Sequence, residues 1–354
     1  MKIRASLIAP MSLLSLAIAS HAQAADEAFQ RSVEQRLAKL EAQQPQGTAP
    51  LAQNVTFSGL VEVEGYVGEA GDESYSDLVV ATVELGLAAQ INDKVSAEVI
   101  ALYEESPGGE EGTELDIDVA TISIANIIGP VNLDVGKMYV PFGRFETALV
   151  NDTLVLEAAE TNKTAALFGM EQDGLSIGAY VFDGDADREQ HVENYGVTLS
   201  FEQENFAVGL DYISALTESD ALVEAAWDEH SPAFSLSGRV TLGEVNLLAE
   251  YLAATSELVL EGETEGFEPE VAHIEANIGV SLNEQPFTFA VAYQQTDDAA
   301  GYLPEERLSL GCSTDIYENV SLGLEYWHDE DYSETDGGSG EDSDNIVVQL
   351  AVSF

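Results

Sequence analysis

The basic side chains of this chain are scarce, and several of them are grouped with acids in one segment. Seven Lys and Arg residues follow Lys39, and three of these lie within or beside residues 139–162. The three are Lys137, Arg144 and Lys163, and the acids near them are Glu146, Asp152, Glu157 and Glu160. Opposed charges that line a narrow passage discriminate between ions. The grouping therefore predicts a selectivity element in which these residues face one another.

The alternative role for these basic residues is structural. An Arg side chain can bind a carboxylate through two parallel hydrogen bonds and so fix one segment to another. For Arg144 both interpretations stay open. Arg239 and Arg307 occupy positions assigned to the inward face of strands, and for these two the structural pairing is favoured over a role in selectivity.

The other reactive residue types form no catalytic or metal-binding pattern. The run Asp183-Gly-Asp-Ala-Asp187 is similar to the start of a calcium loop, but Arg188 replaces the required Gly and Asn194 takes the place of the bidentate Glu. A weakly held divalent ion stays open there. The five histidines lack the spacing of metal ligands, and they are His21, His191, His230, His273 and His328. We therefore expect no enzyme, no cofactor and no resident metal.

The net charge limits the partners that the chain can have. The formal charge is −53, from 65 acidic and 12 basic residues, so phosphates would be repelled and binding to nucleic acid is excluded. The acidity has two explanations: a surface suited to a saline habitat, which is favoured, or a lumen that attracts cations. The single cysteine, Cys312, excludes an internal disulfide and is expected to be inert packing.

The first 54 residues divide into three expected segments. Residues 1–24 have the basic start, apolar core and small-residue cleavage site of a secretory signal peptide. Residues 25–44 carry apolar side chains at coiled-coil spacing and predict a short helix. Pro and Gly residues in 45–54 predict a linker. No later segment is apolar enough for a membrane-spanning helix.

Residues 55–354 alternate apolar and polar side chains in about 16 runs, which predict strands. Short turns alternate with longer acidic connections, such as 68–78 and 139–162. A phase slip near Thr121 predicts a β-bulge. Apolar side chains outside and polar ones inside suit a wall between lipid and water. The chain is therefore predicted to be all-β: a 16-stranded antiparallel transmembrane β-barrel of porin type, preceded by the short coiled-coil helix.

Aromatic residues are predicted to form two girdles, as the two interfaces of a bilayer select. Five tyrosines are expected toward the long-loop end, namely Tyr103, Tyr212, Tyr251, Tyr293 and Tyr326. Five phenylalanines are expected toward the short-turn end, namely Phe57, Phe201, Phe206, Phe287 and Phe354. The inward assignment of Tyr180 and Phe182 weakens the polar-inside pattern. The terminal Phe354 resembles the assembly signal of outer-membrane barrels, and its strand is expected to pair with the first.

The chain as a whole resembles the LbtU family of siderophore porins. The resemblance is carried by the predicted signal peptide and coiled coil, a first strand with Gly59, the central run Gly136-Lys-Met-Tyr-Val-Pro-Phe-Gly-Arg-Phe-Glu-Thr147, and Phe354. It implies a 16-stranded outer-membrane barrel that takes part in uptake of an iron-chelating siderophore. It also implies that no plug domain is present.

We therefore expect a channel in the outer membrane of a Gram-negative bacterium. Solutes would pass by diffusion with little selectivity, and the third long loop, 139–162, would narrow the lumen. Two alternatives stay open: a general cation-selective porin, and a structural or adhesive barrel without transport. The expected partners are outer-membrane lipid and lipopolysaccharide, the barrel assembly machinery, a small solute such as a ferric siderophore, and two further copies in a homotrimer.

Overall fold

The computed structural model describes residues 54–354 except 72, 109–114, 185–191 and 229. The predicted signal peptide (1–24), the coiled-coil helix (25–44) and nearly all of the predicted linker lie outside the described residues. Within the described part, no helix is long and apolar enough to cross a bilayer.

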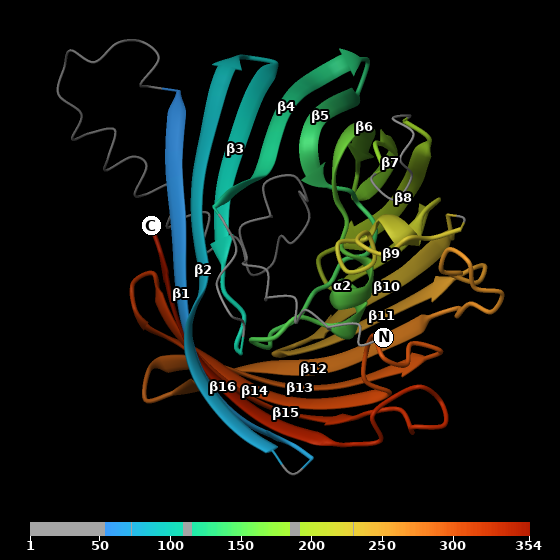
Figure 1. The fold of residues 1–354 in the computed structure, drawn as a ribbon. Helices are drawn as coiled ribbons and strands as arrows, with labels where there is room; N and C mark the ends of the chain where they lie inside the picture. Colours follow the sequence, from blue (N-terminus) through green and yellow to red (C-terminus); the bar gives the residue numbers. More distant parts are fainter. Residues whose placement is uncertain (1–53, 72, 109–114, 185–191, 229) are drawn as a thin grey trace.

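Sixteen antiparallel strands close into one barrel, as the alternation predicted (Figure 1). Each strand pairs with its neighbours in sequence, and β16 returns to β1. Phe354 and Gly59 exchange two backbone hydrogen bonds at this seam, with N–O distances of 2.9 and 3.0 Å. The strands are β1 (Val55–Ala70), β2 (Glu73–Asn92), β3 (Val95–Glu104), β4 (Asp116–Ile128), β5 (Val131–Tyr139), β6 (Asn162–Gln172), β7 (Leu175–Phe182), β8 (Asn194–Gln203), β9 (Phe206–Ile213), β10 (Ala233–Leu242), β11 (Val245–Ala254), β12 (Glu270–Leu282), β13 (Gln285–Asp297), β14 (Glu306–Tyr317), β15 (Val320–Glu330) and β16 (Ser343–Ser353).

The outer face of the wall is apolar and the inner face is polar. Leu85 and Leu236 are 51% and 54% exposed, whereas their neighbours Glu84 and Ser235 are buried. Such a surface fits lipid on the outside and water on the inside. The tyrosines and phenylalanines predicted for the two girdles lie toward opposite ends of their strands, which confirms that arrangement.

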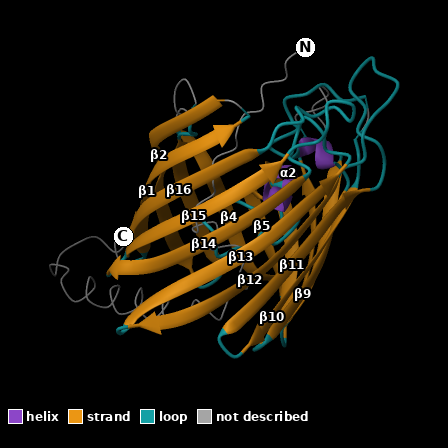
Figure 2. Cartoon of the chain, turned by 90° about the horizontal axis from the view of Figure 1, so that it is seen from below, coloured by secondary structure: helices purple, strands orange, loops and turns teal. Residues whose placement is uncertain are grey.

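The two ends of the barrel differ in their connections (Figure 2). Short turns such as Asp173–Gly174 join the strands at one end, and the longer loops and both described helices gather at the other. The prediction of a long connection over residues 68–78 is wrong. Gly68 pairs with Tyr75 and Ala70 pairs with Glu73, so β1 and β2 continue through this segment, and Gly71 after β1 has φ +56°. The acidic residues there lie on strands that extend beyond the apolar belt.

The predicted irregularity near Thr121 is a β-bulge. Ile100 pairs with Val119, but the next residue, Ala101, pairs with Ile117. Asp118 is therefore the extra residue on β4, and it is buried. The bulge prediction is confirmed, with the slip lying just before Val119.

A buried apolar cluster lies inside the barrel and explains the two inward aromatics. Tyr180 and Phe182 on β7 are 2% and 0% exposed and belong to this cluster. They pack with apolar residues from the connection between β5 and β6, including Phe142 and Leu154. The inner wall is thus apolar at this cluster, where a loop packs on it.

Candidate constriction site

The connection between β5 and β6, residues 140–161, folds into the barrel, and we call it the L3 loop. It ends in a short helix, α2 (Leu154–Ala159), which lies within the ring of strands and contacts β11 and β12 (Figure 1). The helix begins after Thr153, whose Oγ1 accepts a hydrogen bond from the backbone N–H of Leu156 at 3.1 Å. The third long loop therefore lies inside the barrel, as the sequence predicted.

Three glutamates on the inner wall hold the backbone of the L3 loop. Glu250 on β11 accepts the backbone N–H groups of Arg144 and Phe145, both at 2.8 Å. Glu325 on β15 accepts those of Val150 and Asn151, at 2.7 and 2.8 Å.

The third anchor lies between these two along the loop. Glu275 on β12 accepts the Ala148 N–H at 3.0 Å and the Thr147 hydroxyl at 2.6 Å. Beyond it, Gln294 on β13 accepts the Leu154 N–H at 2.7 Å. Hydrogen bonds to charged acceptors are stronger than neutral ones, so these contacts fix the path of the loop.

Glycines on the wall give the loop room. A Cβ at Gly311 on β14 would lie 2.6 Å from Leu149 Cδ2, and one at Gly323 on β15 would lie 2.8 Å from Val150 Cγ2. Both distances are shorter than real carbon contacts. The loop can therefore lie flat on the wall only because these two positions lack side chains.

Two wall arginines predicted as site residues bind acids of the L3 loop. Arg239 on β10 contacts Glu146 at 2.9 Å and Glu202 on β8 at 2.6 Å. Arg307 on β14 contacts Glu157 in α2 at 2.8 Å and Asp329 on β15 at 2.7 Å. Each arginine thus joins the wall to the loop through a pair of carboxylates.

Arg144 reaches the wall in the opposite direction, from the loop. Its Nη2 lies 3.4 Å from Asp211 Oδ1 on β9 and 3.1 Å from the Thr198 hydroxyl on β8. The Arg144 side chain is 28% exposed, while Asp211 is fully buried. Arg144 is therefore the predicted site arginine that retains the most contact with solvent.

The two predicted lysines lie on opposite faces of the wall. Lys163 on β6 is buried and contacts Glu218 at 3.2 Å; Glu218 ends the 3₁₀ helix η3 (Leu216–Glu218). Lys137 on β5 pairs in register with Thr164, which is exposed, and its Nζ lies 3.5 Å from Asp116. The structure therefore does not bring Lys137 together with the acids of the L3 loop.

The last two predicted acids lie at the ends of α2. Glu160 follows the helix, and its carbonyl accepts the Asp220 N–H at 2.8 Å. Burial raises the pKa of Glu160 well above its usual range, and nearby Asp220 raises it further. Burial also raises the pKa of Asp220 to about 6. Asp152 lies between Asn151, which Glu325 binds, and the capping residue Thr153.

The charges inside the barrel are distributed unevenly. Among the described residues, the inward-facing cations Arg144, Lys163, Arg239 and Arg307 all lie within 4 Å of a carboxylate. Strands β1 to β4 contain no Lys or Arg. Their lumen-side acids are Glu62, Glu64, Glu84, Glu98, Glu104 and Asp118. The wall formed by β1 to β4 therefore carries acids and no basic residue on its lumen side.

The sequence does not reveal the three anchoring glutamates. Each is a lone acid between two outward-facing side chains near the middle of a strand, as in Leu324-Glu325-Tyr326. That pattern is visible in the sequence, but it does not show that the partners are backbone amides.

In the described part of the chain, no group of three or more His, Cys, Asp or Glu could hold a metal ion. Residues 185–191 of the calcium-like run lie outside the described residues.

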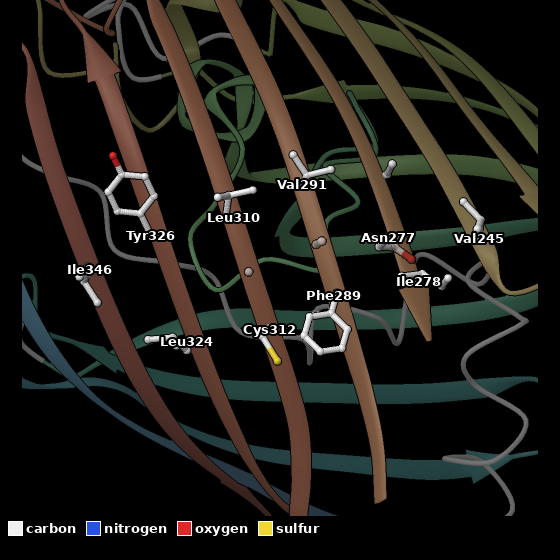
Figure 3. Close-up of a pocket in the computed structure, with 13 residues that line it drawn as sticks. Val245, Asn277, Ile278, Phe289, Val291, Leu310, Cys312, Leu324, Tyr326 and Ile346 are labelled. Carbon is white, nitrogen blue, oxygen red and sulfur yellow. The ribbon is translucent and has the colours of Figure 1, made fainter. Parts of the chain in front are cut away.

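A separate apolar groove of about 590 Å³ lies on the outer face of β11 to β16 (Figure 3). Val291, Leu310 and Leu324 line it, and Cys312 lies among them. These side chains belong to the exposed apolar belt, so the groove faces lipid and is not part of the constriction.

Comparisons with known proteins agree with the fold. The profile of the phosphate-selective porin O and P family matches residues 61–212, which include the whole L3 loop. A UPF0422 protein of Coxiella burnetii is 25% identical over 308 residues, covering 80% of this chain and 66% of that relative. The chain thus matches just under two thirds of that relative's length.

Solved structures give the same result. The anion-selective porin from Comamonas acidovorans has a TM-score of 0.64 at 13% identity, covering 85% of this chain and 99% of the other. OmpT of Vibrio cholerae, an outer membrane protein solved in a trimer form, has a TM-score of 0.55 at 13% identity, covering 85% and 99%. The chain therefore has the fold of a porin-type outer-membrane β-barrel.

Proposed function

We propose that this protein is an outer-membrane diffusion channel in which the L3 loop narrows the path and the acidic wall favours cations. The observation that carries the proposal is the L3 loop itself, which crosses the inner wall from β9 to β15 and is bound there. A solute that crosses the barrel must pass between this loop and the part of the wall that the loop leaves uncovered. Transport is then diffusion past a fixed narrowing, without chemical turnover.

The preference for cations is supported by the charges on the two sides of the path. On the loop side, each described inward-facing cation is within 4 Å of at least one carboxylate. The wall of β1 to β4 carries acids and no Lys or Arg. The names of the phosphate-selective family and of the anion-selective porin imply a preference for anions. The preference proposed for this chain has the opposite sign.

Planar-bilayer recordings test both the formation of a channel and its preference for cations. We expect discrete conductance steps and a reversal potential of cationic sign in a KCl gradient. The preference should weaken at high salt, because the Debye length falls from about 10 Å at 0.1 M to about 3 Å at 1 M. Glu98→Gln removes one acid from the wall and should shift the reversal potential toward zero, whereas Glu261→Gln in an exposed loop should not. An anionic reversal potential would contradict the cation preference, and absence of steps would favour a structural or adhesive barrel.

A ferric siderophore is the second candidate solute, and the central run 136–147 favours it. This run, which carries the resemblance to siderophore porins, forms the end of β5 and the first half of the L3 anchors. The acidic wall favours a neutral or cationic ferric complex over an anionic one. Growth on a ferric siderophore as sole iron source, with and without the gene, tests this role; equal growth would count against it.

A homotrimer is proposed by analogy with the trimeric OmpT structure, and the mass of the detergent-solubilised protein tests it.

A further inference from the structure

We propose that Glu250, Glu275 and Glu325 are positioning residues that set the width of the channel by holding the backbone of the L3 loop. The inference rests on the proposed diffusion function, since it concerns the narrowest part of that path. The three side chains are 6%, 0% and 0% exposed, so they are anchors and not part of the solvated passage.

The anchors recur at a spacing of three residues along the loop. The bound groups belong to residues 144 and 145, then 147 and 148, then 150 and 151. The loop therefore presents a pair of donors to the wall once per three residues. The wall meets each pair with one carboxylate, which can accept several hydrogen bonds.

The loop is recognised mainly through its main chain. Five of the six bound donors are backbone N–H groups, and the Thr147 hydroxyl is the sixth. These five hydrogen bonds therefore do not depend on which side chain the loop residue carries. Removal of a wall carboxylate breaks them, because it leaves two partly buried donors without their acceptor.

Close packing supplies the second half of the positioning. Leu149 lies against Gly311 and Val150 lies against Gly323. Leu149 falls between the donors that Glu275 and Glu325 bind, and Val150 supplies one of the donors to Glu325. The carboxylates bind the loop to the wall, and the two glycines allow a short distance between the loop and the wall. The aperture is then determined by residues that the solute does not touch.

The test measures loop mobility and conductance on the same protein. Leu149→Cys in a Cys312→Ser background gives one thiol on the loop, whose labelling rate reports detachment. Glu275→Ala should raise this rate about tenfold, the shift expected when charge-assisted hydrogen bonds to a loop are lost. It should also raise open-channel noise. Glu98→Ala is the matched control, since it removes a lumen carboxylate that makes no hydrogen bond to the L3 loop among the described residues.

A rescue experiment separates positioning from a simple charge effect. Leu149 Cα lies 3.8 Å from the point that a Cβ at Gly311 would occupy, so cysteines at these two positions are close enough to form a disulfide. Adding Gly311→Cys to the Glu275→Ala variant and oxidising it should restore quiet conductance, and reduction should abolish the rescue. A crosslinked variant that stays noisy, or an unchanged labelling rate without the crosslink, would overturn the inference.

Two further outcomes are distinguishable. If Glu275→Ala does not assemble, Glu325→Ala removes the one oxygen that accepts both the Val150 and the Asn151 N–H and should also raise the labelling of the same loop; no rise would overturn the inference. If the wild-type protein forms no channels, the proposed function fails, while the labelling rates still decide whether the three glutamates hold the loop.

Discussion

Arg307→Met is expected to loosen the L3 loop from the wall because it removes the cation from a buried cluster of three charges. Arg307 is 8% exposed and binds Asp329 through two hydrogen bonds, at 2.7 and 3.1 Å, and Glu157 through a third, at 2.8 Å. Burial raises the pKa of Glu157, and Arg307 opposes that rise. Without Arg307, two partly buried carboxylates face each other, and the pKa of Glu157 rises further. Met keeps much of the apolar volume of the Arg side chain.

The size of the effect follows from burial. Removal of one partner of a buried ion pair costs about 3 to 5 kcal/mol, because the remaining charge is unpaired. The Glu157 and Asp329 side chains are 23% and 16% exposed, so we expect the low end, about 3 kcal/mol. Denaturant unfolding in lipid or detergent, followed by tryptophan fluorescence, measures this. Adding Glu157→Gln should recover part of the loss by removing one uncompensated charge. A loss below about 1 kcal/mol, the value of an exposed pair, would refute the reasoning.

Three further predictions concern the loop and its surroundings. Arg144→Ala should shift the reversal potential toward cations, since Arg144 is the most exposed inward-facing arginine; an unchanged potential would leave it a structural link between loop and wall. Asp220→Asn should raise stability at pH 7 by about 2 kcal/mol, since the raised folded pKa of about 6 means that stability falls as pH rises from about 4 to 6. Thermal unfolding at pH 4 and 7 should show a smaller loss of stability with rising pH in the variant than in the wild type; equal losses would contradict the prediction. Gly323→Val should displace Val150 and change single-channel conductance while leaving ion selectivity in place, and an unchanged conductance would show that the loop does not need this space.

The strands could be predicted from the sequence because lipid and water lie on opposite faces of each one. A side-chain period of two therefore marks the wall wherever it crosses the bilayer. The prediction failed between Gly68 and Leu78, where β1 and β2 extend beyond the apolar belt and pair without a lipid-facing pattern. The inward positions of Tyr180 and Phe182 also depart from the pattern, because these side chains pack against a loop inside the barrel. The side-chain period of a strand does not show that such a loop is present.

The candidate site could be predicted only where side chains pair with side chains. The length and charges of the loop predicted that it lies inside the barrel, and the inward strand positions of Arg239 and Arg307 favour structural links. The structure places both against loop acids, which supports that role. The anchoring glutamates escaped prediction because their partners are main-chain amides, which every residue has and no sequence pattern marks. The signal peptide and coiled coil remain predictions, since they lie outside the described residues.

The order in which this protein folds follows from where the anchors of the L3 loop lie in the chain. The loop leaves β5, but the acceptor for Arg144 comes 106 residues later and the acceptor for Val150 comes 175 residues later. Contacts between residues so far apart form late, because much of the chain must be ordered before they can form. The loop therefore reaches its final position only after β15 has joined the wall. Until then the growing barrel is wider inside than the finished one, and its narrowing is among the last events of assembly.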